Sequence, residues 1–253
     1  MMKYFGLPVL ASRHGADVDR LIVYVHIMMG LLFVGWTAYF VYVLWRFSAS
    51  RMQRADYVGA RTHASTYIEV AVAIAEVVLL FFLAVPYWSN AVEKFPAESE
   101  STVLRITARQ FNWNARYPGA DGKFGPNRLE LVASDNPLGL DRTDPATKDD
   151  VLAEGNEMAV PVDKPVIAHI SSLDVIHSFK VVPLRMTQDA TPGLSVPVHF
   201  IPTRTNTYQI QCSQLCGNGH AQMRGWFKVL SQEEFDAWLK SKPLAGAGPI
   251  SYE

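Results

Sequence analysis

The chain has 253 residues, a net charge of −1, and 49% hydrophobic but only 19% charged residues. A nucleic-acid-binding protein normally carries a basic excess, so this charge balance argues against one. Residues 1–90 hold seven Lys or Arg and five Asp or Glu, whereas residues 91–253 hold sixteen and nineteen. Because the N-terminal third is so apolar and the remainder is an ordinary polar domain, the sequence excludes both a purely soluble protein and a many-pass transporter.

Two apolar runs lie in the N-terminal third. Residues 21–45 contain no Asp, Glu, Lys or Arg, and as a helix they reach about 37 Å, enough to cross a hydrocarbon core of about 30 Å. Residues 67–88 form a second run, which contains Glu69 and Glu76. These two acids are seven residues apart and share one helical face. Glu69, near the end of the span, is either functional or exposed at the interface, whereas Glu76, nearer mid-membrane, is expected to face a partner subunit. We predict a two-span transmembrane hairpin over residues 1–90.

The loop between the runs indicates the direction of insertion. It contains a single acid, Asp56, and four arginines: Arg46, Arg51, Arg54 and Arg61. Basic loops remain in the cytoplasm, so both termini and everything after Asn90 are expected on the outer side.

Short strand-like segments broken by prolines follow from residue 101. We predict an all-β domain over residues 91–240 with Greek-key connections, a long insertion at 119–156, and a flexible tail at 241–253. Ser231 and Glu234 have the spacing of a capping box and predict one helix near the end of the domain. Six acids crowd the insertion or border it, and they are interpreted as a solvated surface rather than a docking patch: Asp141, Asp144, Asp149, Asp150, Glu154 and Glu157.

The two cysteines of the chain lie in one soft-donor cluster. Within twelve residues, Cys212, Cys216, His220 and Met223 offer two thiols, an imidazole and a thioether. A disulfide is one alternative, and zinc another, but zinc has no use for the methionine. Two thiolates can instead bridge two copper ions, which requires a second histidine from another strand. The domain offers three candidates: His169, His177 and His199.

The sequence resembles subunit II of the haem–copper cytochrome c oxidases. The resemblance covers nearly the whole chain and is carried by three segments: Asp174-Val-Ile-His177-Ser-Phe, Asp189-Ala-Thr-Pro-Gly193, and Cys212-Ser-x-x-Cys-Gly-x-x-His-x-x-Met223. It implies a cupredoxin-like fold with a dinuclear copper centre of the CuA type. The implied metal ligands are His177, Cys212, the backbone carbonyl of Gln214, Cys216, His220 and Met223.

The resemblance also assigns roles away from the copper pair, with departures. Gln214 replaces the family's usual Glu, which helps to hold a magnesium or manganese ion where Asp189 and residue 214 meet the catalytic subunit. Phe111 replaces the exposed Trp of an aromatic run that continues to Trp113, where electrons enter. Glu69 matches an acid near a proton-uptake channel, while Glu76 stands where the family usually has Pro.

The implied function is to accept electrons from cytochrome c, or an equivalent periplasmic donor, and pass them to haem in the catalytic subunit I. That subunit reduces oxygen to water and pumps protons. The expected setting is the bacterial inner membrane, with the copper domain periplasmic, lipid around the hairpin, other oxidase subunits as partners and a respiratory supercomplex as a further candidate. The alternatives are a quinol-oxidising relative, a nitrous oxide reductase, and a zinc- or disulfide-stabilised binding domain on a two-span anchor.

Overall fold

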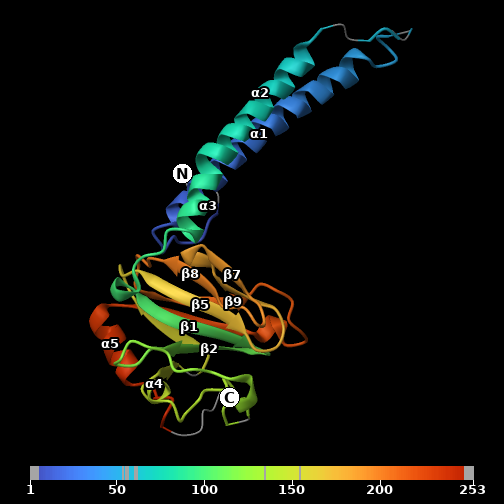
Figure 1. Ribbon diagram of the computed structural model, residues 1–253. Helices are drawn as coiled ribbons and strands as arrows, with labels where there is room; N and C mark the ends of the chain where they lie inside the picture. The colour runs from blue at the N-terminus through green and yellow to red at the C-terminus, as the bar shows by residue number, and fades with distance from the viewer. Residues whose placement is uncertain are drawn as a thin grey trace. The chain divides into compact units, whose positions relative to one another are not determined.

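The computed structural model describes residues 6–52, 54, 57–59, 62–133, 135–153 and 155–247. The chain forms two compact units (Figure 1). One contains Asp17–Asn90 and is helical. The other contains Ala91–Glu253 together with the N-terminal segment Pro8–Ala16. Three parts of the sequence predictions lie outside the described residues: the loop residues Asp56 and Arg61, Glu154 of the insertion, and residues 248–253 of the tail.

The helical unit contains two helices long and apolar enough to cross a membrane. The first, α1, spans Gly15–Arg46, and the second covers Ala64–Val92. The second helix consists of α2 (Ala64–Leu79), a π-helical turn η2 (Leu80–Ala84) and α3 (Val85–Val92). Pro86 has no backbone N–H and its ring crowds the carbonyl four residues earlier, so a widened turn directly before it relieves the clash. Both runs predicted from the sequence are confirmed as helices.

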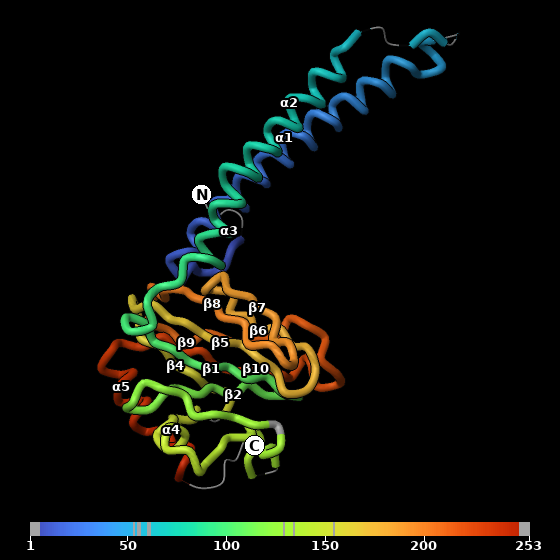
Figure 2. The backbone as a smooth tube through the Cα atoms, in the orientation of Figure 1, coloured from blue at the N-terminus to red at the C-terminus, as the bar shows by residue number. Residues whose placement is uncertain are grey.

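The second unit is a sandwich of two five-stranded sheets (Figure 2). In spatial order the first sheet contains β3 (Val151–Ala153), β2 (Asn112–Tyr117), β1 (Thr102–Arg109), β5 (Val166–Ser172) and β8 (Val196–Phe200). The second contains β4 (Glu157–Pro161), β10 (Arg224–Leu230), β9 (Asn206–Cys212), β6 (His177–Val181) and β7 (Met186–Ala190). Two neighbouring pairs are parallel, β1 with β5 and β10 with β4. The predicted all-β, cupredoxin-like domain is therefore confirmed.

Alternating side chains fill the space between the sheets. In β1 every second residue is buried, as expected of a strand with one face on a core. Aromatic rings dominate the centre: Trp113 meets Phe179 edge-on at 5.2 Å between ring centroids, and Phe179 meets Phe227 at 6.4 Å. Edge-to-face pairs of this kind add to the free energy gained by burying the rings. This core reaches the functional site, because Trp113 also packs against His177.

The predicted C-terminal helix is α5 (Gln232–Lys240), and its capping box is present. The Ser231 hydroxyl accepts a hydrogen bond from the Glu234 backbone N–H at 3.2 Å. The Glu234 carboxylate accepts one from the Ser231 backbone N–H at 2.9 Å. These two bonds satisfy donors that a helix start otherwise leaves unpaired.

The predicted insertion contains more structure than a loop. It includes short helical turns, η4 (Leu129–Leu131) and α4 (Pro145–Lys148), and ends in β3, which pairs with β2 and so belongs to the first sheet. A small separate core of Leu138, Leu140, Leu152 and Ala245 lies beneath it. A strand of three residues is too short to produce a recognisable alternation, so the sequence did not reveal it.

Both ends of the β unit differ from the predicted boundaries. Residues 8–16, predicted as part of the hairpin, belong to the β unit: the Ala11 N–H donates to the Pro183 carbonyl, and the Thr203 N–H donates to the Ala11 carbonyl, both at 2.8 Å. Residues 241–247, predicted as flexible, are held in place: Ala245 is fully buried and its N–H donates to the Asp150 carbonyl at 2.8 Å.

This docking of the C-terminal segment predicts a sharp difference between two neighbouring alanines. Ala245→Asp should lower the free energy of unfolding by about 2 kcal/mol or more, because it buries a carboxylate without a partner. Ala247→Asp, at an exposed position, should change it by less than about 0.5 kcal/mol. Thermal unfolding of both full-length variants in detergent would measure this, and equal unfolding midpoints would show that the segment is not docked.

Candidate metal centre

Three segments bring the predicted copper ligands together at one end of the sandwich. His177 begins β6, Cys212 ends β9, and the following loop carries Cys216, His220 and Met223 back to β10. Strands β6 and β9 are antiparallel neighbours with Phe179 opposite Cys212, so the end of one strand lies beside the start of the other. This register explains how a histidine 35 residues before Cys212 becomes its neighbour.

The donor atoms of these residues form one cluster. The two cysteine Sγ atoms are 3.8 Å apart, and the ligand atoms of His177, Cys212 and Cys216 all lie within 4.8 Å of one another. The Cys216 Sγ is 3.6 Å from the His220 Nδ1 and 3.8 Å from the Met223 Sδ. The Cys212 Sγ is 4.0 Å from the His177 Nδ1 and 3.1 Å from the Gln214 carbonyl oxygen.

The two cysteines are free thiols, because 3.8 Å is far longer than the S–S bond of about 2.05 Å. The structure therefore contradicts the disulfide alternative. Burial, together with the neighbouring Cys212 thiol, raises the pKa of Cys216 to about 11. Without a metal this sulfur keeps its proton at neutral pH, so a bound metal ion has to displace that proton.

The donor set fits copper. His177, Cys216 and Met223 are buried, while Cys212 and His220 are partly exposed beside a cavity of about 320 Å³. Two thiols, two imidazoles and a thioether are soft or intermediate donors, which favour copper or zinc over magnesium or calcium, and the Gln214 carbonyl oxygen is the one hard donor beside them. A four-ligand zinc site would leave Met223 without a role, although its sulfur lies within the cluster.

Asp174 orients one of the imidazoles, a role that the sequence analysis did not assign. The His177 Nε2 lies 2.9 Å from the Asp174 Oδ1, which leaves the Nδ1 on the side of the Cys212 sulfur. Burial opposes ionisation of Asp174, but hydrogen bonds from the Gln110 N–H, the His177 ring and the Val175 N–H hold its pKa below the usual value. An ionised partner of this kind fixes the tautomer of a metal-binding histidine. In the sequence, the signal for this role is that Asp174 lies three residues before His177.

The predicted aromatic residues lie against the same cluster. The Gln110 side-chain Nε2 donates to the Cys216 carbonyl at 2.6 Å, which ties the β1–β2 turn to the cysteine loop. The Phe111 ring covers Gly219 so closely that a Cβ there would lie 2.5 Å from the Phe111 Cδ2. Phe111 remains 37% exposed, whereas Trp113 is buried with its ring centroid 6.2 Å from that of His177.

The remaining predicted side chains are exposed. Glu69 is an exposed residue of α2 in the helical unit. Asp189, on β7 opposite Ser178, is exposed, and so is the side chain of Gln214. A magnesium or manganese ion beside Gln214 stays a prediction of the resemblance.

Comparison with known proteins identifies the family. Residues 102–228 match the family model described as cytochrome c oxidase subunit II, periplasmic domain. The alternative cytochrome c oxidase subunit 2 of Bradyrhizobium diazoefficiens is 30% identical over 218 residues, which cover 86% of this chain and 77% of the relative. The cytochrome c oxidase subunit 2 of Cereibacter sphaeroides is 28% identical over 249 residues, which cover 93% of this chain and 79% of the relative.

Among solved structures, the periplasmic domain of subunit II of cytochrome oxidase from Bradyrhizobium japonicum is 29% identical. It matches with a TM-score of 0.43, covering 58% of this chain and 96% of that one. The matched family segment spans half of the chain and contains every donor of the cluster. The chain therefore belongs to the cytochrome c oxidase subunit II family, whose members are subunits of a haem–copper oxidoreductase.

Proposed function

We propose that this chain is the electron-accepting subunit of a cytochrome c oxidase and that His177, Cys212, Cys216, His220, Met223 and the Gln214 carbonyl hold a dinuclear CuA centre. The observation that carries the proposal is the convergence of two thiols, two imidazoles and a thioether within one cluster. When bound, a copper pair supplies one-electron transfer, with the change in charge shared between two ions.

The residues of the chain prepare this site in three ways. The two cysteine sulfurs lie 3.8 Å apart, so both would be available to hold the copper pair. Asp174 holds His177 with its Nδ1 toward the sulfurs, so the ring need not turn when a metal binds. Burial of Cys216 and Met223 keeps water from one side of the cluster, which limits rearrangement of solvent when charge changes.

The surface around the cluster suits a donor that binds by apolar contact. Ile176 and Leu215 directly precede two of the ligands and are 45% and 79% exposed, and the ring of Phe111, in the β1–β2 turn, lies against Gly217 and Gly219 of the cysteine loop. The acids of the insertion have local partners instead. Asp150 pairs with Arg116, and Asp144 caps α4. We infer that cytochrome c, or a similar periplasmic donor, meets the chain over Phe111 and passes its electron through the cluster to haem in the catalytic subunit.

We also propose that the β unit is periplasmic and that the chain crosses the membrane twice. The contacts of residues 8–16 with the β unit support an even number of crossings, because both segments have to lie on the same side of the membrane. The described arginines of the intervening loop, Arg46, Arg51 and Arg54, favour a cytoplasmic loop.

The first prediction for this function concerns the copper pair. Cys216→Ser should abolish binding of both coppers rather than halve it, because each ion would lose a bridging sulfur. Ser213→Ala, a neighbouring exposed position, should keep about two coppers per chain, as the dinuclear site requires. Metal analysis with spectroscopy of the purified full chain would decide, and a mixed-valence signal in Cys216→Ser would rule out the bridging arrangement.

The second concerns the donor. Phe111→Ala should slow reduction of the copper site by the native donor about tenfold or more, as expected when an aromatic anchor is truncated. Leu244→Ala, which removes another exposed apolar side chain, should leave the rate unchanged. Stopped-flow reduction at several ionic strengths would measure both. A rate that falls steeply with salt but is insensitive to Phe111→Ala would move the docking site to the acidic insertion.

The third concerns the direction in the membrane. Protease added to intact spheroplasts should digest residues 91–253 if the domain is periplasmic. Immunoblotting against the C-terminal domain would follow the digestion. Protection in spheroplasts, with digestion only in inverted vesicles, would show that the proposed direction is wrong.

The fourth concerns Glu69, which we propose takes part in proton uptake from the cytoplasmic side. Glu69→Ala should slow steady-state oxygen consumption by the assembled oxidase several-fold while reduction of the copper site stays normal. Glu76→Ala provides a matched control on the same helix. If oxygen consumption were unchanged in Glu69→Ala, the acid would have no role beyond the membrane interface.

A further inference from the structure

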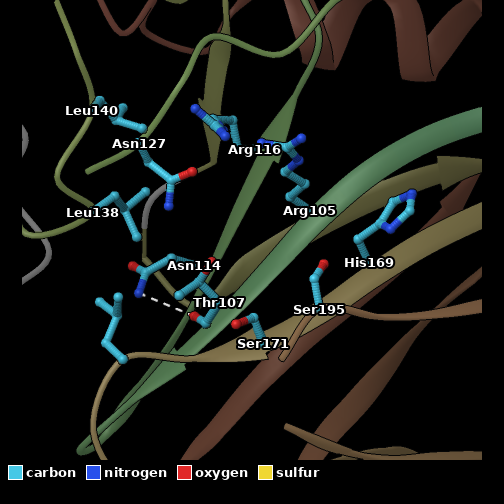
Figure 3. A pocket seen from close by; sticks show the side chains of 11 residues that line it. Arg105, Thr107, Asn114, Arg116, Asn127, Leu138, Leu140, His169, Ser171 and Ser195 are labelled. Carbon is cyan, nitrogen blue, oxygen red and sulfur yellow. Dashed lines mark hydrogen bonds between the residues drawn. The ribbon is translucent and has the colours of Figure 1, made fainter. Parts of the chain in front are cut away.

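A second cavity, of about 250 Å³, lies on the face of the first sheet that points away from the sandwich core (Figure 3). Its floor is formed by side chains of β1, β2 and β5, and its opposite wall by Leu138 and Leu140 of the insertion. Ser195 lies at its edge, at an exposed position. None of the copper-site residues lines this cavity.

Strand register places its polar side chains in two rows. Arg105 of β1 is opposite Arg116 of β2 on one side and His169 of β5 on the other. In the next row, Thr107 lies between Asn114 and Ser171. Like charges directly across neighbouring strands destabilise a sheet, so two arginines in this register need negative charge nearby.

Only one of these two arginines has a carboxylate at ion-pair distance among the described residues, although the charge of Asp150 acts on both. Arg116 lies 3.2 Å from the Asp150 Oδ2, and both side chains are buried. The Arg105 guanidinium lies 4.4 Å from the Phe124 ring centroid, and no described residue forms a hydrogen bond or an ion pair with it. Arg105 therefore presents a cation to the cavity, and no Asp or Glu is among the described residues that line it.

His169 adds a neutral polar group beside this cation. Burial, and then the nearby Arg105 charge, lower the pKa of His169 below its ordinary value of 6.5, so its ring is neutral at pH 7. A neutral imidazole offers one donor and one acceptor, and the hydroxyls of Ser171 and Ser195 offer further donors. Arg105, Arg116 and Asp150 together leave one net positive charge beside these neutral hydrogen-bonding groups.

The wall formed by the insertion combines two leucines with the amide of Asn127 (Figure 3). Leu138 and Leu140 line the cavity from the insertion, and Leu173 lines it just after β5. A volume of about 250 Å³ exceeds what a single inorganic anion requires but falls below the range of drug-sized ligands, which begins near 300 Å³. The expected occupant is therefore small, singly charged and amphipathic.

We propose that this cavity binds a small organic carboxylate, with its carboxylate on Arg105 and its short apolar tail against Leu138 and Leu140. The planar guanidinium matches a planar carboxylate through two parallel hydrogen bonds, and a single negative charge balances the net positive charge of Arg105, Arg116 and Asp150. Inorganic phosphate would leave the leucine wall unused. The proposal concerns a site separate from the copper ligands and does not depend on the proposed electron transfer.

Isobutyrate is a suitable probe, because it carries one carboxylate and a short branched tail and partitions little into detergent. The experiment titrates isobutyrate into the full-length chain in detergent micelles and follows binding by saturation-transfer NMR of the ligand. Isobutyramide, which has the same shape without the charge, and inorganic phosphate serve as matched ligands. The variants are Arg105→Gln, Ser195→Trp to obstruct the cavity edge, and Arg204→Gln as a control that removes an exposed cation elsewhere.

We expect saturable isobutyrate binding that is weakened at least tenfold in Arg105→Gln and Ser195→Trp and is unchanged in Arg204→Gln. We expect isobutyramide and phosphate to bind at least tenfold more weakly than isobutyrate. Ser195→Trp keeps the test decisive if Arg105→Gln fails to fold, because it leaves the buried charges intact. Equal isobutyrate affinity in wild type and the folded variants, no saturable binding at all, or equal binding of phosphate would overturn the proposal.

Discussion

The short pairing of β6 with β9 is the constraint on which the rest of the site depends. Only two residue pairs join these strands, with Phe179 opposite Cys212 and Lys180 opposite Gln211. Because side chains alternate between the two faces of a strand, a slip of one residue would turn His177 away from Cys212. The buried ring of Phe179 resists that slip, since a shift of one residue would turn it away from the core and from Trp113. Core packing and donor geometry are therefore the same requirement in this domain.

A second requirement is that the two sheets meet at the end of the sandwich that carries the donors. Gln110 lies in the turn between β1 and β2 of the first sheet, yet it bonds to Asp174 through its backbone and to Cys216 through its side chain. One residue thus connects the orientation of an imidazole to the position of a thiol. The glycines beneath Phe111 allow this close approach, because a Cβ on Gly219 would overlap the ring. Hydrogen bonds of this kind, from residues that are not themselves metal ligands, help to position the donors.

Several features could be predicted from the sequence because they depend on residues close together in the chain. The two apolar helices, the capping box at Ser231 and the cysteine loop are of this kind. His177 required the family resemblance, since 35 residues separate it from Cys212. The docking of Ala11 and Ala245, the three-residue strand β3 and the role of Asp174 were not predicted. Each depends on partners distant in sequence or on a pattern too short to distinguish from a loop.

The attachment of residues 8–16 has a consequence for the order in which the protein matures. This segment is synthesised before both helices, but its hydrogen-bonding partners, among them Pro183, Arg185, Ile201 and Thr203, lie about 170 to 190 residues later in the chain. Such contacts of high sequence separation close late in folding. The N-terminal segment therefore lacks its hydrogen-bonding partners while both helices and most of the sandwich are synthesised. The N-terminal segment can therefore dock only after residues 183–203 have emerged from the ribosome.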